Sequence, residues 1–469
     1  MAFKIRSTDN EMTISYENRY LGDSENLALA KNIYTEMRKY PIISPHGHVD
    51  PKMILANENF ADPVSLLMAP DHYILRMLHS QGISYESLAS NAPEANFKLL
   101  AENWKLFRST PSRIWFQEIL ATLFDVSGIL APDNAMKIYA QIAAKLATPE
   151  FKPQALFKSF NIELLATTDA TADSLQPHID LSKIDLGGRV IPTFRPDDVS
   201  DPARTDWKIT LENLGKRYGI EINSFANLLA ALRKARAHFK DNGATASDHG
   251  VFSPRTLKVS AAQGEALFAS AFSGTATENE LNDFRAVMLF EHAIMAADDG
   301  LVMQLHPGSL RNYDAEIFAK FGPDKGFDIP VATTYTKELQ PLLNAVGKHP
   351  NFRLVIFTLD ESTYSRELAP LAGAYPSVRL GPPWWFHDSL NGLERWREAV
   401  TETAGYYNTV GFIDDTRAFC SIPVRHDVAR RFDSAYLARE VSRHRITENE
   451  AMELAGDIAY NLSKDFFNL

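Results

Sequence analysis

The 469-residue sequence has little cysteine, no long apolar run and no excess of positive charge. Its one cysteine, Cys420, has no partner for a disulfide within the chain, which is typical of a reducing compartment. No apolar segment approaches the about 18 residues of a transmembrane helix, and residues 1–12 lack the apolar centre of a signal peptide. We therefore expect a cytoplasmic protein with no membrane partner.

The charge balance also excludes a class of partners. The chain has 48 Lys and Arg against 59 Asp and Glu, a net charge of -11. A protein that binds nucleic acid normally concentrates excess positive charge, so we expect no nucleic-acid partner. The sequence also contains no G-x-G-x-x-G after a strand and no P-loop, so nothing predicts a nucleotide cofactor. An acidic small molecule is still compatible, because a few arginines in a cleft can reverse the local charge.

Short apolar segments alternate with helix-like segments along most of the chain, and this order predicts parallel βαβ units. A helix predicted over 286–297 precedes a strand, and another over 339–346 precedes the next one. The predicted strands are residues 41–45, 164–167, 190–194, 301–305, 354–357, 378–380 and 409–413. Their number approaches eight, which favours an α/β fold of the (β/α)8 TIM-barrel type.

Polar residues at the ends of these strands distinguish a barrel from an open doubly wound sheet. In a (β/α)8 barrel the chemistry lies at the carboxyl ends of several different strands. Here the strand ends have the polar or aromatic residues His46, His48, Asp169, Arg195, His306, Trp384, Trp385, Asp415 and Arg417. We expect them to converge on one rim.

One segment has no predicted strand. Residues 61–160 show only helical spacing of apolar residues, for example Trp115, Ile119 and Phe124. We interpret this segment as a helical insertion after the first strand that folds over the mouth of the barrel. The predicted organisation is therefore an N-terminal segment with the first strand (1–60), the insertion (61–160), and the rest of the barrel with extra C-terminal helices (161–469).

His46 and His48 flank a glycine at the end of the first predicted strand. Side chains alternate along a strand, so the two imidazoles lie on the same face. Two titrating groups crowded together without a ligand would be unfavourable, and the pattern therefore predicts a metal site. By sequence alone, either Asp414 or Asp415 could complete it.

An ordered set of motifs resembles a known family. His46-Gly-His48 with a carboxylate at the last strand is similar to the amidohydrolase superfamily of metal-dependent (β/α)8 barrels, and more narrowly the chain resembles the uronate isomerases. The matching segments are PHGHVDP (45–51), DHY (71–73), TTDA (167–170), PTFRPD (192–197), SDHG (247–250), QLHPG (304–308), GPPWWF (381–386), DDTR (414–417) and SIPVRHD (421–427). The resemblance implies that the substrates are uronic acids: an aldose–ketose isomerisation of D-glucuronate to D-fructuronate and of D-galacturonate to D-tagaturonate.

The resemblance also implies roles for individual residues. It favours Asp415 over Asp414 and implies that Asp415 both contacts the metal and transfers a proton. Arg417 is expected to neutralise the developing oxyanion or to hold Asp415. His72 and Tyr73 lie in the insertion, where a lid would supply hydrogen bonds to substrate, and His72 is the candidate general acid.

Further residues are expected to bind the sugar. Arg195 offers a planar fork for substrate oxygens, and His306 is a third imidazole near the metal or a group that orients the substrate. Trp384 or Trp385 lines the pocket, since only one of two successive strand residues faces it. Sequence leaves the roles of Asp169, Asp248 and His249 open.

The cofactor expected is one divalent metal ion, with Zn²⁺ favoured by the mixed nitrogen and oxygen ligands His46, His48 and Asp415. No organic cofactor is expected. No histidine follows the strand at 354–357, which favours a single metal and isomerisation over hydrolysis. A metal-dependent hydrolase and a non-catalytic sugar-acid binding protein remain the alternatives, and a homo-oligomer is expected from the apolar helical extensions.

Overall fold

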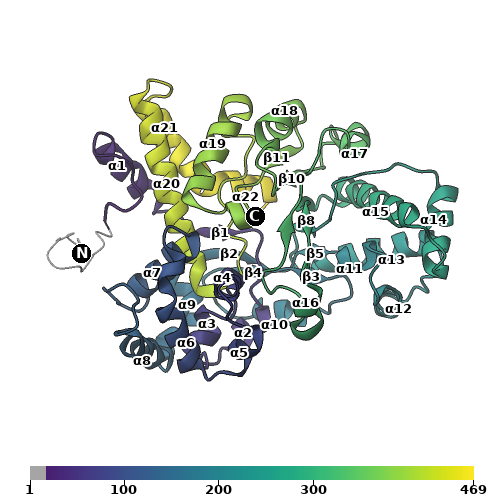
Figure 1. Ribbon diagram of the computed structural model, residues 1–469. Coiled ribbons are helices and arrows are strands. Elements are labelled where there is room, and N and C mark those ends of the chain that lie inside the picture. Colours follow the sequence, from purple (N-terminus) through teal and green to yellow (C-terminus); the bar gives the residue numbers. More distant parts are fainter. Residues whose placement is uncertain (1–16) are drawn as a thin grey trace.

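Parallel strands form a closed (β/α)8 barrel in the computed structural model, which describes residues 17–469 (Figure 1). The prediction about residues 1–12 lies outside this range. In order around the barrel the strands are β1 (Ile42–Ser44), β2 (Ile162–Ala166) continued by β3 (Asp169–Ala170), β4 (Arg189–Ile191) continued by β5 (Phe194–Arg195), β6 (Ala246–His249), β7 (Val302–Leu305), β10 (Leu354–Ile356) and β11 (Val378–Leu380). Every pairing among them is parallel.

The eighth position of the barrel differs from the prediction. We expected a strand over 409–413, but the structure has one parallel bridge, between Leu380 and Thr409. Gly411 adopts φ +73°, a left-handed conformation that interrupts an extended strand. The barrel still closes, because the backbone N–H of His48 donates to the carbonyl of Thr416 over 3.0 Å.

Helices occupy the long connection between β1 and β2. Proline opens several of them, at the first-turn position where its missing N–H costs no hydrogen bond. They are α2 (Pro51–Ala56), α3 (Pro63–Leu67), α4 (His72–His79), α5 (Tyr85–Ser90), α6 (Pro93–Glu102), η1 (Trp104–Phe107), α7 (Pro111–Thr122), α8 (Ala135–Leu146), η2 (Pro149–Phe151) and α9 (Pro153–Ser159). Their apolar side chains share one core with Ile42 of β1 and Leu165 of β2, so the insertion packs directly on the barrel. The boundaries at 60 and 160 remain predictions.

The helices of the barrel itself follow the later strands. They are α10 (Gln176–Leu181), α11 (Asp197–Ser200), α12 (Trp207–Tyr218), α13 (Phe225–Asp241), α14 (Ala261–Ser273), α15 (Glu278–Asp299), α17 (Gln340–Val346), the π-helical η3 (Tyr364–Leu368), α18 (Ala369–Ala374), η4 (Trp385–His387) and α19 (Leu390–Ala404). One excursion was not predicted: after β7 the chain forms an antiparallel hairpin of β8 (Ser309–Leu310) and β9 (Ile329–Pro330), with α16 (Ala315–Phe321) between them. This hairpin extends from the end of the barrel where β7 finishes.

The first described helix packs against C-terminal helices on one side of the barrel. The remaining helices are α1 (Leu27–Met37), η5 (Phe419–Ser421), α20 (Ile422–Ser442), α21 (Glu448–Gly456), the π-helical η6 (Asp457–Asn461) and α22 (Leu462–Phe467). Figure 1 shows α1 beside α20 and α21, and their apolar residues form a common core. Phe467 of α22 packs with Ala246 and Val302, which begin their strands. The last helix therefore covers the amino end of the barrel and leaves the carboxyl end open.

Within the described part of the chain, no helix combines the length and apolarity needed to cross a membrane.

Candidate active site

A cavity of about 1380 Å³ opens at the carboxyl ends of the barrel strands. It exceeds the roughly 300–1,000 Å³ typical of small-molecule sites. The insertion contributes Leu66, Asp71, His72, Tyr73 and Trp115 to its wall. All ten residues predicted for the site line this cavity: His46, His48, His72, Tyr73, Arg195, His306, Trp384, Trp385, Asp415 and Arg417.

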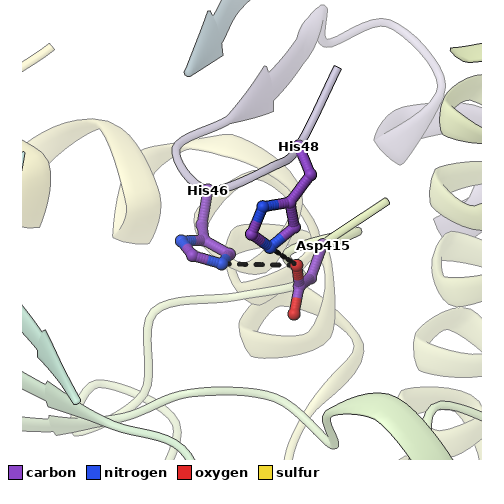
Figure 2. Close-up of side chains that lie close together, drawn as sticks. All are labelled: His46, His48 and Asp415. Carbon is purple, nitrogen blue, oxygen red and sulfur yellow. Dashed lines mark ion pairs between the residues drawn. The ribbon is translucent and has the colours of Figure 1, made fainter. Parts of the chain in front are cut away.

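His46, His48 and Asp415 meet at the closure between the first and last positions of the barrel (Figure 2). The Nε2 atoms of His46 and His48 lie 3.3 and 3.1 Å from the same carboxylate oxygen, Oδ1 of Asp415. A Cβ at Gly47 would lie 3.3 Å from the carbonyl oxygen of Ala166, so only a small residue fits easily between the two histidines. Asp415 has φ +40°, a strained backbone that aims its side chain at the imidazoles.

The electrostatics favour an ionised Asp415. Burial disfavours its charged form, but the imidazoles of His46 and His48 outweigh burial and hold the pKa of this carboxyl well below its usual value. The neighbouring Asp414 points elsewhere, because its Oδ1 lies 2.9 Å from Nε2 of His426. The structure thus brings Asp415, and not Asp414, to the two imidazoles.

The donor set fits a divalent metal ion. Two imidazole nitrogens and one carboxylate oxygen lie within 4.8 Å of one another, and these are ligands that Zn²⁺ and similar ions accept. A second such group, His46, Asp248 and His306, shares His46 with the first. In that group Nδ1 of His306 lies 2.7 Å from Oδ1 of Asp248, while the buried Nε2 of His306 has no partner among residues 17–469. The residues present therefore form a cluster able to hold a metal.

Arg195 lies at the end of β5 between two carboxylates. Its Nε donates to Oδ2 of Asp197 over 2.7 Å, and its Nη1 lies 3.3 Å from Oδ2 of Asp248. Burial opposes ionisation of Asp248, yet Arg195 and His306 hold the pKa of this carboxyl well below its usual value. Asp248, whose role sequence left open, therefore links Arg195 to His306.

His72 and Tyr73 occupy the first turn of α4. Asp71 caps this helix by accepting hydrogen bonds from the backbone N–H groups of Tyr73 and Ile74, at 2.9 and 3.2 Å, and so fixes where both side chains begin. Burial, followed by the charge of Arg417, lowers the pKa of His72 to about 4. Burial raises the pKa of Tyr73 well above its usual value. Both shifts favour the neutral side chain at pH 7.

Both tryptophans line the cavity, contrary to the expectation that only one would. That expectation assumed an extended strand, whereas Trp385 begins the 3₁₀ turn η4 with φ +56°. The ring of Trp384 lies edge-on to His306, with centroids 4.7 Å apart. The indole of Trp385 instead reaches His72 across the cavity, with Nε1 donating to Nε2 over 3.0 Å.

The β8–β9 excursion brings two charged residues to the mouth that sequence analysis missed. Asp324 pairs with Arg417, whose Nη1 lies 2.8 Å from its Oδ2. A Cβ at Gly250 would lie 2.5 Å from Nη2 of Arg195 and 3.4 Å from Nη2 of Arg311, so the two guanidinium groups flank this glycine. Arg311 directly follows β8, in the segment that begins after the predicted strand 301–305, and this position could have identified it from the sequence.

Two further polar groups at the strand ends are engaged with the protein. Asp169 accepts a hydrogen bond from Oγ1 of Thr167 over 2.6 Å, and burial raises the pKa of this carboxyl to about 7. Nε2 of His249 lies 3.0 Å from Oγ of Ser247, and burial lowers the pKa of His249 to about 3. These hydrogen bonds join both side chains, which line the cavity, to neighbouring residues.

Comparison with known proteins agrees with this geometry. A family model described as glucuronate isomerase matches residues 12–467. A uronate isomerase of Rhizobium meliloti (strain 1021) is 48% identical over 451 residues, covering 94% of this chain and 96% of the relative. The crystal structure of glucuronate isomerase from Caulobacter crescentus has a TM-score of 0.95 at 46% identity and covers 97% of both chains. That of uronate isomerase from Thermotoga maritima has a TM-score of 0.92 at 30% identity and covers 97% of this chain and 100% of that one. A chain matched over nearly its whole length in both sequence and structure is a member of the glucuronate isomerase family.

Proposed function

We propose that this protein isomerises uronic acids, converting D-glucuronate to D-fructuronate and D-galacturonate to D-tagaturonate. One observation carries the proposal: the carboxylate of Asp415 lies within 3.3 Å of two imidazoles in a cavity that His72, Tyr73 and Arg195 also line. Family membership and near-complete coverage by uronate isomerases support it. The hydrolase and the non-catalytic binding protein are not favoured by these comparisons.

The reaction moves one proton from C2 to C1 and changes no net oxidation state. A base removes the C2 proton, which leaves an enediolate with its charge on the C1 oxygen. The proton of the C2 hydroxyl then moves to the C1 oxygen, and the base returns its proton to C1, which gives the ketose. In the proposal Asp415 is the base, because its Oδ2 receives no hydrogen bond from residues 17–469 while Oδ1 faces the imidazoles. Proton transfer through an enediolate needs no carrier of electrons or hydride, and we propose no organic cofactor.

His72 and Tyr73 are proposed to donate hydrogen bonds to the C1 and C2 oxygens. The sequence made His72 the candidate general acid. Its pKa, lowered to about 4, favours a neutral imidazole, so we propose that it donates a hydrogen bond instead. A neutral imidazole N–H and a neutral phenol instead stabilise the negative charge that develops on the enediolate. In this proposal the insertion supplies the hydrogen-bond donors and the barrel supplies the base.

Guanidinium groups are proposed to bind the acidic end and the hydroxyls of the sugar. Arg195 and Arg311 flank Gly250, and Arg417 lies beside Asp324 at the mouth. A planar fork matches carboxylate oxygens. Each of the three arginines is also paired with carboxylates of the protein: Arg195 with Asp197 and Asp248, Arg311 with Asp328, and Arg417 with Asp324. Trp384 and His306 form the apolar side of the same pocket.

We propose one divalent ion, Zn²⁺, held by His46, His48 and Asp415. When bound, such an ion supplies a positive charge that orients the substrate's carboxylate and adjacent hydroxyl. Imidazole nitrogens and a carboxylate oxygen are compatible with Mn²⁺, Fe²⁺ or Co²⁺ as well. The cytoplasmic location and the homo-oligomer also remain predictions.

The test of the function is proton NMR of the metal-loaded protein with D-glucuronate, and separately D-galacturonate, in deuterated buffer. Ketose signals should appear, and deuterium at the carbon beside the carbonyl would support the enediol. Failure of both sugars to react in a folded, metal-replete sample would overturn the proposal. Cleavage of an ester, lactone or amide by that sample would identify the hydrolase instead.

Removal of the metal should reduce both activity and thermal stability. Zn²⁺ that binds only the folded protein at about 100 times its Kd would stabilise it by about 2.7 kcal/mol. Dialysis against a chelator should therefore lower Tm by a few degrees, and Zn²⁺ should restore it. The His48→Ala variant is the comparison: its Tm should respond little to Zn²⁺. An equal response in both proteins would place the ion elsewhere.

The pH dependence distinguishes a neutral His72 from a protonated one. Because its pKa is lowered to about 4, the proton is already absent above about pH 5, and no loss of kcat/KM should follow from its ionisation between about pH 5 and 8. A protonated acid would instead lose activity as pH rises through its pKa. A decline centred near the ordinary histidine pKa of about 6.5, absent from the His72→Asn variant, would contradict the prediction.

A further inference from the structure

We infer that Trp385 holds His72 in a single neutral tautomer, with the proton on Nδ1 and none on Nε2. The indole Nε1 lies 3.0 Å from Nε2 of His72. An indole N–H donates and never accepts, so Nε2 must be the acceptor in this contact. A neutral imidazole with a bare Nε2 has its proton on Nδ1.

The position of the indole is fixed by its surroundings. Trp385 has φ +56°, which is unusual for a bulky residue and persists only where neighbouring structure enforces it. Its ring stacks on that of Phe386, with the two centroids 5.4 Å apart and the ring planes inclined by 6°. The guanidinium of Arg311 lies 5.5 Å from the ring centroid. The indole N–H is therefore directed at His72 before a ligand arrives.

The charges around His72 act in the same direction. Arg417, Arg425 and Arg76 disfavour a second proton on the ring, and Asp324 only partly offsets them. Burial disfavours the imidazolium as well. A hydrogen bond received at Nε2 also stabilises the neutral ring, because protonation at this atom would break it.

The tautomer determines which ring nitrogen of His72 can donate a hydrogen bond to a ligand. No hydrogen bond joins Nδ1 to any of residues 17–469, while the side chain lines the cavity. The Nδ1–H group is thus the donor available to a substrate oxygen. His72 comes from α4 of the insertion and Trp385 from η4 after β11. One hydrogen bond across the mouth therefore determines which nitrogen of His72 carries the proton. Trp385 is a positioning residue, since it acts through His72.

The tautomer is measurable without turnover, by NMR of protein labelled with ¹⁵N-histidine and loaded with Zn²⁺. Long-range ¹H–¹⁵N correlations distinguish a protonated ring nitrogen from a bare one, and the His72→Asn variant assigns the signals of His72 by their loss. We expect a protonated Nδ1 and a bare Nε2 in the wild-type protein. A protonated Nε2, or an imidazolium at pH 7, would overturn the inference even if the Trp385 variants fail to fold.

The Trp385→Phe variant tests the cause. It keeps an aromatic ring and removes the donor, so both tautomers of His72 should become populated and kcat should fall by about tenfold, with a smaller change in KM. Trp384→Phe is the matched control, because Trp384 makes no hydrogen bond to His72; it should leave the tautomer unchanged. A retained Nδ1–H tautomer in Trp385→Phe would refute the role of Trp385.

The inference rests on the proposed function only for its effect on kcat. If neither uronate reacts but the wild-type protein shows Nδ1–H, the function fails and the tautomer assignment stands. If both uronates react but Nε2 carries the proton, the reverse holds.

Discussion

The Asp415→Asn variant should lose turnover by about 10³-fold or more while keeping its fold. An amide cannot accept the C2 proton, and positioned acid–base groups typically contribute 10²–10⁴-fold, so a loss of roughly this size is expected in kcat. Asparagine has nearly the same volume as aspartate and removes only the charge. Ketose formation from D-glucuronate measures the effect, and thermal melting followed by circular dichroism reports the fold.

Two controls separate the base from the metal site. Zinc content is measured in the same preparation, because Oδ1 of Asp415 also faces both imidazoles. Asp414→Asn is the matched variant: its side chain binds His426 and not the site, and an amide oxygen preserves that contact, so turnover should stay within a few-fold of wild type. Near-normal turnover of Asp415→Asn with zinc retained would remove Asp415 from the mechanism.

The arrangement of the rim was predictable because strand direction alone determines it. Parallel strands of a barrel present their carboxyl ends at one edge, so residues that follow apolar segments must meet there. His46, Arg195 and His306 are far apart in the sequence but follow three such segments, and all line one cavity. His46 and His48 both reach Asp415, as the HxH spacing predicted, although β1 ends at Ser44 and the two histidines lie beyond the strand.

What sequence could not predict depends on local backbone that breaks the regular pattern. Four of the non-glycine residues with positive φ line the cavity: Asn312, Asp324, Trp385 and Asp415. Propensity predicts neither such strained conformations nor the side-chain directions they impose. The β8–β9 hairpin was missed because its strands are two residues long, and with it the positions of Arg311 and Asp324. The expectation that only one of Trp384 and Trp385 would face the pocket failed because Trp385 has a positive φ and does not continue a strand.

These irregular segments also explain how the site joins two parts of the chain. The barrel supplies Asp415, the proposed base, and the candidate metal ligands, whereas the insertion supplies His72 and Tyr73. The hydrogen bond between Trp385 and His72 and the packing of Phe386 against Tyr73, with ring centroids 6.1 Å apart, connect the two across the mouth. The contact between the insertion and the barrel at His72 therefore depends on the irregular turn that follows β11.

Replacement of His72 by its two amide analogues should reveal which ring nitrogen works. The amide nitrogen of asparagine can occupy nearly the position of Nδ1, whereas that of glutamine reaches the position of Nε2. If Nδ1–H stabilises the enediolate, His72→Gln should lower kcat by about 10²–10³-fold, as loss of one oxyanion donor does, and His72→Asn should lower it less.

The comparison is internally matched, since both variants remove the imidazole and keep a neutral amide on the first turn of α4, where Asp71 still caps the helix. Initial rates with D-glucuronate and with D-galacturonate, at saturating sugar, give the two kcat values. Greater activity in His72→Gln than in His72→Asn would assign the catalytic donor to Nε2, and equal, near-wild-type rates would show that His72 contributes no donor at all. A third outcome is that wild-type His72 keeps its proton on Nδ1 while both variants are equally poor. In that case neither amide position restores activity, and the imidazole is needed for a reason other than the position of its proton.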